Sequence, residues 1–369
     1  MTFLPQINIA LDGEPILTIE QIDLLRASLA GRIIALCFGA GVDSTAMLVA
    51  LRSAGIRPDV ITFADTGGEK PPTLLHVDRM NEVLAGWGWP LIETCRKVPL
   101  AKTGYTDLYG NCLKNETLPS LAFGMKSCSI KWKTNAQDLL LKGARSGPSA
   151  RPPHPVWQRA CEMGQTIVKL IGYDAGKADM RRARNMSANA DGFEYQYPLQ
   201  LLGWTRPDCV KAITRSLGAH LVPIKSACFF CPASKHWELY WLAAHYPEQL
   251  EDALVLERVA LTGRHSRFDT VEFGATWEEM VRNADRFPST KTTVGLGRSF
   301  AWNQWARVNG VVDGDFRVIR SKREHFIAMA DMLRGDDNAL DRRSCGDDAP
   351  AAEQPSSFVG FMSLEEAFA

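Results

Sequence analysis

Short apolar runs alternate with amphipathic stretches along the first two thirds of the chain. Residues 17–30 (LTIEQIDLLRASLA) have the spacing of an amphipathic helix, and Thr18 and Gln21 are placed as a capping box at its start. The apolar run GRIIALCFG at 31–39 follows and predicts a buried strand. DSTAMLVALRSAG at 43–55 then predicts a helix. The order helix, strand, helix is typical of an α/β domain.

The same alternation continues downstream. Residues 57–68 contain a second apolar strand that ends in Asp-Thr-Gly-Gly, a helix is predicted over about 72–86, and WPLIETC at 89–95 predicts a third strand. TIVKLIGYD at 166–174 predicts a later strand of the same sheet. This pattern predicts a Rossmann-like parallel sheet with helices on both faces. Ligands bind such sheets at the carboxyl ends of the strands.

Beyond about residue 203 the pattern becomes mostly helical, and Thr205 with Asp208 three positions later predicts a helix start. The tail is acidic and rich in Pro, Ser and Ala, a composition typical of disorder. We therefore expect four segments: an N-terminal helix (1–30), a nucleotide-binding α/β domain (31–215), a helical C-terminal region (216–335) and a disordered tail (336–369).

Charge is balanced over the whole chain but not along it. The 369 residues contain 42 Lys and Arg against 42 Asp and Glu. Residues 126–184 carry twelve basic against four acidic side chains, whereas residues 331–369 carry three against nine. A local basic surplus suits a phosphate-rich ligand, which is a nucleotide or a DNA or RNA strand. A solvated basic face is the alternative.

The N-terminal residues lack a basic flank followed by an apolar run, and no stretch reaches eighteen apolar residues. We therefore expect a cytoplasmic protein with no membrane partner. The nine cysteines form no even, closely spaced framework. In a cytosolic chain this favours metal, cluster or catalytic thiols over disulfides.

The turn in LCFGAGVDSTAML (36–48) carries candidate chemistry, because small residues there let backbone N–H groups approach a phosphate. The helix that follows places its N-terminus, which favours negative charge, at the same point. A tight turn without a ligand is the alternative. The candidate phosphate-binding residues are Gly39, Ala40, Gly41, Asp43, Ser44 and Thr45.

Five segments in order give the sequence a family resemblance. GAGVDST resembles a degenerate PP-loop (Ser-Gly-Gly-x-Asp-Ser) of the adenine nucleotide α-hydrolase superfamily. Four further segments, ADTGGEKPPT, KSCSIKWK, IGYDAGKADMRRARN and YPLQLLGWTRPDCVKAI, are similar to later motifs of its PAPS reductase-like family. The resemblance covers residues 31–235. Gly39 and Ala40 stand where the family has Ser-Gly, which removes a hydroxyl and adds a methyl.

The resemblance implies an enzyme that acts at the α-phosphate of an adenine nucleotide, with ATP and Mg²⁺ as cofactors. Asp43 and Asp65 are the candidates for holding Mg²⁺ or the ribose, and Asp43 is also a candidate catalytic residue. Thr66 and Gly67 belong to the implied nucleotide site. Cationic side chains would neutralise charge on the transferred phosphate, and the candidates are Lys131, Lys133, Arg181 and Arg182, with Arg184 beside them.

KSACFFCPASK (225–235) contains a Cys-x-x-Cys pair, which can grip one metal ion or one cluster, and two distant cysteines can complete four ligands. The resemblance to iron–sulfur members of the family points to Cys128, Cys228 and Cys231, with Cys112 as the fourth ligand of a [4Fe–4S] cluster. Ser129 follows Cys128, so the adjacent Cys-Cys pair of iron–sulfur reductases is absent. Structural Zn²⁺ and a redox dithiol or plain buried thiols are the alternatives.

Three functions are compatible with these features. The first is an ATP-using enzyme that adenylates a substrate, such as a nucleic acid, for sulfur insertion, with a sulfur-donor protein as partner. The second is a sulfonucleotide reductase, for which the nearest match to the attacking thiol is Cys345 in RRSCGDDA. The third is a catalytically silent nucleotide-binding subunit. Replacing Cys345 would inactivate only a reductase.

Overall fold

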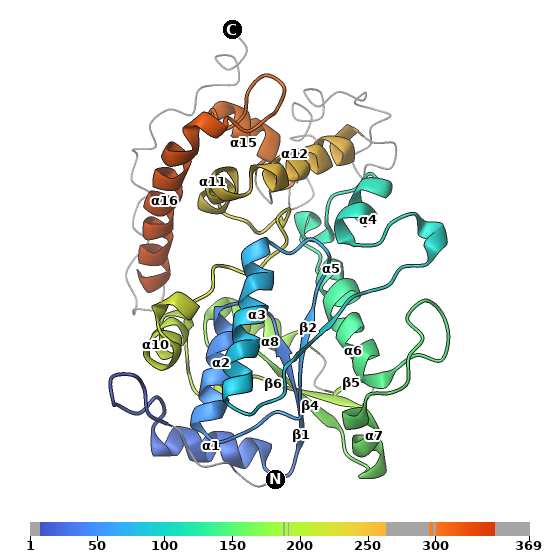
Figure 1. The fold of residues 1–369 in the computed structure, drawn as a ribbon, viewed down its shortest axis with the longest axis vertical. Coiled ribbons are helices and arrows are strands. Elements are labelled where there is room, and N and C mark those ends of the chain that lie inside the picture. Colours follow the sequence, from blue (N-terminus) through green and yellow to red (C-terminus); the bar gives the residue numbers. More distant parts are fainter. Residues whose placement is uncertain (1–7, 187–188, 191, 263–294, 298–299, 344–369) are drawn as a thin grey trace. The chain divides into compact units, whose positions relative to one another are not determined.

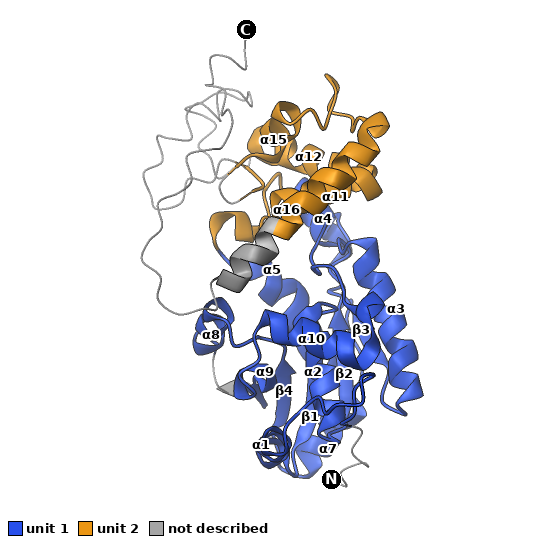
Figure 2. Cartoon of the chain, turned by 90° about the vertical axis from the view of Figure 1, so that its left-hand side faces the viewer, with its two compact units in different colours: residues 1–114, 125–229 blue, residues 115–124, 230–369 orange. Residues whose placement is uncertain are grey.

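The computed structural model describes residues 8–186, 189–190, 192–262, 295–297 and 300–343. The chain forms two compact units. Unit 1 comprises residues 1–114 and 125–229, and unit 2 comprises residues 115–124 and 230–369 (Figure 2).

Unit 1 is built on a six-stranded sheet with the order β3-β2-β1-β4-β6-β5. The first five strands in this order pair in parallel, whereas β5 pairs antiparallel with β6. The predicted parallel sheet is therefore confirmed, with a short antiparallel edge added to it. The strands are β1 (Ile33–Phe38), β2 (Val60–Ala64), β3 (Ile92–Cys95), β4 (Ile167–Ile171), β5 (Asn189–Ala190) and β6 (Phe193–Gln196).

Helices cover both faces of this sheet (Figure 1). One face packs against α1 (Ile19–Leu29), α2 (Val42–Ser53), α3 (Pro71–Gly86), α9 (Pro198–Leu201) and α10 (Arg206–Leu217), which share one apolar core with alternate residues of β1, β2 and β4. The opposite face packs against α6 (Asn135–Lys142) and α7 (Pro155–Glu162). This two-sided burial explains why β2 is apolar along most of its length rather than alternating.

Local signals place the helix ends where the sequence predicts them. Thr18 and Gln21 form the expected capping box of α1, and Thr205 and Asp208 form that of α10. Shorter helices lie between the main elements: α4 (Leu108–Lys114), α5 (Ser127–Ser129), a π-helical turn (Ile130–Thr134) and α8 (Lys177–Arg184) in unit 1. Single 3₁₀ turns span Ala101–Thr103, Ser120–Phe123, Ala219–Leu221 and Arg320–Lys322.

The strand order places the switch point of the sheet beside β1. From β1 the chain proceeds to β2 and β3 on one side, and it later returns to add β4 and β6 on the other. Loops that leave the carboxyl ends of β1 and β4 therefore diverge and leave a crevice between them.

Unit 2 contains α11 (His236–His245), α12 (Pro247–Thr262), α15 (Trp302–Val308) and α16 (Arg323–Arg343). Glu257 is buried in α12 and accepts hydrogen bonds from the backbone N–H groups of Leu296, Trp302 and Asn303. Helix α16 ends at Arg343, so it occupies residues 336–343 at the start of the predicted tail. The rest of that tail, 344–369, lies outside the described residues, and so does Cys345.

None of the helices within the described ranges combines the length and the apolar character that crossing a membrane requires.

Candidate functional site

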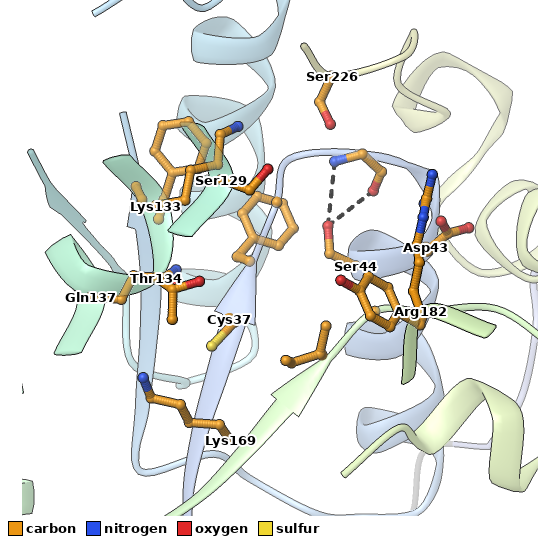
Figure 3. Close-up of a pocket in the computed structure, with 18 of the residues that line it drawn as sticks. Cys37, Asp43, Ser44, Ser129, Lys133, Thr134, Gln137, Lys169, Arg182 and Ser226 are labelled. Atoms are coloured by element: carbon orange, nitrogen blue, oxygen red, sulfur yellow. Dashed lines mark hydrogen bonds between the residues drawn. The ribbon is translucent and has the colours of Figure 1, made fainter. Parts of the chain in front are cut away.

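A cavity of about 410 Å³ opens at the carboxyl ends of β1 and β4, at the switch point of the sheet (Figure 3). Cys37 and Phe38 from β1 and Ile171 from β4 line it, together with the turn before α2. Its volume is within the range usual for small-molecule sites. The predicted phosphate loop therefore lies where parallel sheets bind ligands.

Hydrogen bonds within the loop fix its shape. The Ser44 hydroxyl accepts from Gly41 N at 3.3 Å and donates to Gly41 O at 3.1 Å (Figure 3). Thr45 Oγ1 donates to the same carbonyl at 2.9 Å and is buried, so Thr45 supports the loop from behind. Ala40 has a left-handed φ of 52°, which is the reason a glycine suits this position.

Gly172, directly after β4, has no room for a side chain. A Cβ atom there would lie 2.8 Å from Ser44 N and 2.9 Å from Ser44 Cα. The end of β4 therefore packs directly on the first turn of α2 and sets the position of the loop. The glycine is visible in the sequence, but this contact between distant segments is not.

Three carboxylates meet beside the loop. One oxygen from each of Asp43, Asp174 and Asp179 lies within 4.8 Å of the others. Arg206 binds Asp43 at 2.9 Å, and Arg182 binds Asp179 at 2.5 Å. Asp174 and Asp179 come from the segment after β4, and sequence reasoning did not identify them as site residues.

Burial raises the pKa of Asp43 to about 7, with Asp174 and Asp179 adding to the rise and Arg206 opposing it. Burial also raises the pKa of Asp174. Oδ1 of Asp43 is buried and has no hydrogen-bond partner among the described residues. An oxygen in this state fits a bound cation, and hard oxygen ligands suit Mg²⁺.

The cationic candidates divide into two groups. Lys133 and Arg182 line the cavity, as do Arg206 and Lys225, which sequence reasoning did not single out. Lys131 and Arg181, by contrast, are exposed and do not line it, and Arg184 is exposed as well. Lys133 comes from the π-helical turn, a feature that occurs frequently at functional sites.

The segment after β2 does not line this cavity. The Asp65 carboxylate forms an ion pair with Arg96 and accepts from Gly67 N at 2.7 Å. Gly67 has a left-handed φ of 79°, and a Cβ there would lie 2.4 Å from Cβ of Asp107. Asp65 and Gly67 thus shape a turn. The carboxylates that lie beside Asp43 are those of Asp174 and Asp179 instead.

Thr66 belongs to a polar chain that reaches from the cavity to a predicted metal ligand. Lys133 Nζ lies 3.0 Å from Oε1 of Glu69, whose side chain is fully buried. Thr66 donates to that same oxygen at 3.1 Å, and its hydroxyl lies 3.1 Å from Sγ of Cys228. Glu69 and Cys228 also pair through an antiparallel bridge of their backbones. Sequence reasoning missed Glu69.

Three of the predicted cluster ligands, Cys112, Cys128 and Cys228, belong to unit 1. Burial raises the pKa of Cys112 to about 12, and the neighbouring Cys128 and Asp107 add to the rise. The fourth, Cys231, is a residue of unit 2.

No protein-family model and no curated protein matches the sequence. The chain is similar to several solved structures, two of which follow. One is phosphoadenylyl-sulfate (PAPS) reductase from Candida auris in a phosphate complex, which has 15% identity and a TM-score of 0.32 over 57% of this chain and 88% of the other. The second is the U34-tRNA thiolase NcsA from Methanococcus maripaludis with its [4Fe–4S] cluster, which has 12% identity and a TM-score of 0.34 over 65% and 78%.

At these values the two structures carry no argument about activity. The fold class expected from the sequence is confirmed by the strand order and by the helices on both faces.

Proposed function

We propose that unit 1 binds ATP in the cavity and transfers its adenylyl group to an acceptor substrate. One observation supports this most strongly: the loop 39–44 and the N-terminus of α2 form one wall of a cavity that five cationic side chains also line. A helix N-terminus and fixed cations together favour a polyanion such as a triphosphate.

In the proposed reaction an acceptor oxygen attacks the α-phosphorus, the bond from that phosphorus to the bridging oxygen breaks, and pyrophosphate leaves. Charge then accumulates on the α-phosphate and on the leaving group. Lys133, Arg182 and Arg206 line the cavity and are the candidates to stabilise it. Asp43 lines the same cavity and is the candidate catalytic residue, as a carboxylate that would hold Mg²⁺ beside the phosphates.

Mg²⁺ is the cation that we assign to Asp43, Asp174 and Asp179, because these oxygens converge and one of them has no hydrogen-bond partner among the described residues. A bound Mg²⁺ would offset phosphate charge. Asp65 is not part of this set, since Arg96 occupies its carboxylate.

For sulfur chemistry we propose a [4Fe–4S] cluster on Cys112, Cys128, Cys228 and Cys231. The donor set supports it: Cys228 and Cys231 form a Cys-x-x-Cys pair in the sequence, and Cys112 and Cys128 can complete four thiolate ligands. Structural Zn²⁺ on the same four sulfurs is the alternative, and the iron and sulfide content of the protein distinguishes the two.

The acceptor that we propose is a nucleic acid, with a separate protein supplying the sulfur. Arg181 and Arg184 on α8 are exposed, while Arg182 of the same helix lines the cavity. A phosphate backbone bound along the exposed side of α8 would place a base near the α-phosphate. Such contacts predict binding that weakens steeply with salt.

Anaerobically purified protein provides the test. About four irons and four sulfides per chain are expected, with loss of iron in Cys228→Ser. Pyrophosphate release from ATP should require RNA or DNA, and it should fall at least a hundredfold in Lys133→Met but less than twofold in Lys131→Met. If the protein reduces a sulfonucleotide and Cys345→Ser abolishes that activity, the result would support a reductase instead. Nucleotide binding without any turnover would support a silent subunit.

A further inference from the structure

Lys169 is a charged residue inside the sheet. It occupies the middle of β4 between Ala35 of β1 and Tyr195 of β6, and only 1% of its surface is exposed. It forms an ion pair with Asp138 of α6, and its ammonium lies 3.9 Å from the ring centroid of Phe193. Its side chain nevertheless lines the cavity.

Other polar groups gather around this lysine. Gln137 donates from Nε2 to the backbone oxygen of Thr62 at 3.1 Å, which fixes the orientation of its amide. Figure 3 shows Lys169, Cys37, Thr134 and Gln137 on the side of the cavity away from Ser44, Asp43 and Arg182. We call these four residues the base slot, and all four line the cavity.

The cations of the cavity differ in burial. Lys133, Arg182 and Arg206 also line the cavity and are 36%, 49% and 46% exposed, so they can meet a solvated phosphate, whereas Lys169 is almost fully buried. In the base slot the charge of Lys169 is matched by Asp138, so the pair is neutral overall. A low-dielectric slot with a neutral pair disfavours an added phosphate and suits an uncharged group that both donates and accepts hydrogen bonds.

We propose that the base slot binds the nucleobase and that Lys169 determines base specificity. This rests on the proposed ATP function. Adenine presents ring nitrogen N1 as an acceptor beside the N6 amino group as a donor. Lys169 donates to N1, and the Gln137 carbonyl oxygen accepts from N6. Asp138 contacts the lysine rather than the base in this arrangement and is a positioning residue.

Stability does not explain the Lys169–Asp138 pair well. Replacing a buried ion pair with apolar residues of similar volume is often neutral or stabilising, whereas removing one partner alone is strongly destabilising. The double variant Lys169→Met with Asp138→Leu should therefore fold. Lys142→Met is a matched control, because Lys142 lies 4.9 Å from the same Phe193 ring but does not line the cavity.

The experiment measures calorimetric affinities for ATP, 1-deaza-ATP and inorganic tripolyphosphate. A hydrogen bond from a charged donor predicts a loss of about tenfold to a hundredfold when it is removed. The double variant should lose that much affinity for ATP and less than twofold for tripolyphosphate, and Lys142→Met should lose neither. The wild-type protein should bind 1-deaza-ATP, which lacks N1, at least tenfold more weakly than ATP.

Equal affinity of the wild-type protein for ATP and 1-deaza-ATP would overturn the assignment of Lys169, even if the double variant failed to fold. An equal loss of ATP and tripolyphosphate affinity in a folded double variant would overturn it too, since that result indicates a structural role. No ATP binding by the wild-type protein would instead reject the proposed function itself.

Discussion

His76 Nε2 lies 2.9 Å from the hydroxyl oxygen of Thr45, and that hydroxyl donates to the carbonyl of Gly41 at 2.9 Å. Because the threonine hydrogen is already used, the histidine must donate from Nε2, so it is the neutral Nε2–H tautomer. Burial lowers the pKa of His76 to about 4, and Arg79 adds to this. A neutral histidine from α3 thus braces the phosphate loop from behind.

The hydrogen bond between neutral His76 and Thr45 predicts that the protein loses stability in acid. The folded pKa of about 4 is below the unfolded value of 6.5, so the unfolded chain binds more protons between these pH values. The contribution of His76 is fully present above pH 6.5 and is lost as the pH falls toward 4, by about 3 kcal/mol in total. Urea unfolding of metal-free protein across this range measures it.

His76→Gln is the control for the pH experiment, because glutamine can donate to Thr45 but does not titrate. The difference in unfolding free energy between wild type and His76→Gln should grow in favour of the variant as the pH falls. A difference that is constant across this pH range would show that His76 titrates in the folded protein as it does in the unfolded chain.

Gly172→Ala should weaken phosphate binding. The new Cβ would meet the backbone of Ser44 at 2.8 Å, and a backbone atom in α2 cannot move aside as a flexible side chain would. We expect a destabilisation of about 1–3 kcal/mol, typical of overpacking, and at least a tenfold loss of tripolyphosphate affinity. Chemical unfolding and calorimetry measure the two effects.

Gly86→Ala is the matched control, since a Cβ at this last residue of α3 would meet nothing within 4 Å. It should leave phosphate affinity unchanged and stability equal or higher, because alanine favours helix. If Gly172→Ala behaves like Gly86→Ala, the close contact between β4 and α2 does not set the position of the loop.

Local patterns predicted most of the architecture of unit 1. The period of apolar residues predicts β1, β2, β3 and β4, and side-chain capping at Thr18 and Thr205 predicts two helix starts. Such features depend on residues that are close in the sequence, within one turn or one strand, so the local sequence pattern is enough to predict them. The loop 39–44 was predictable for the same reason, as a small-residue turn between a strand and a helix.

The partners within the site depend on tertiary contacts and were not predictable in the same way. Asp65 directly follows a strand, which is where the sequence predicts a carboxylate of the site. In the structure its carboxylate forms an ion pair with Arg96 instead. Asp174 and Glu69 acquire their roles from residues more than sixty positions away. Lys169 did carry a signal, a lysine within the apolar run TIVKLIG, which only a cavity or a charge partner can explain.

Lys133→Ala should destabilise unit 1 as well as reduce activity. Glu69 is fully buried, Lys133 binds its Oε1, and its Oε2 has no hydrogen-bond partner within the described part of the chain. Loss of the lysine therefore leaves a buried carboxylate poorly compensated. Because Lys133 itself is 36% exposed, we expect about 1–3 kcal/mol rather than the full penalty of a buried pair.

Unfolding of Lys133→Ala, Glu69→Gln and the double variant tests this coupling. Glu69→Gln removes the charge that needs compensation, so the double variant should recover most of the stability lost in Lys133→Ala. Lys131→Ala, two positions away and exposed, should change the unfolding free energy by less than about 0.5 kcal/mol. Additive effects of the two substitutions would refute an energetic link between Lys133 and Glu69.

Ala40→Gly should stabilise the protein, unlike most alanine-to-glycine changes. Ala40 has a φ of 52°, and the left-handed region costs a residue with a Cβ about 1–2 kcal/mol. Glycine avoids this but adds about 0.4–1 kcal/mol of entropy to the unfolded chain. The net gain is therefore about 0–1.6 kcal/mol, which urea unfolding measures. Ala54 is the control, since it is equally buried but has a φ of −82°. Ala54→Gly should therefore lower the free energy of unfolding by about 1 kcal/mol. Similar losses of stability in both variants would show that Ala40 is unstrained.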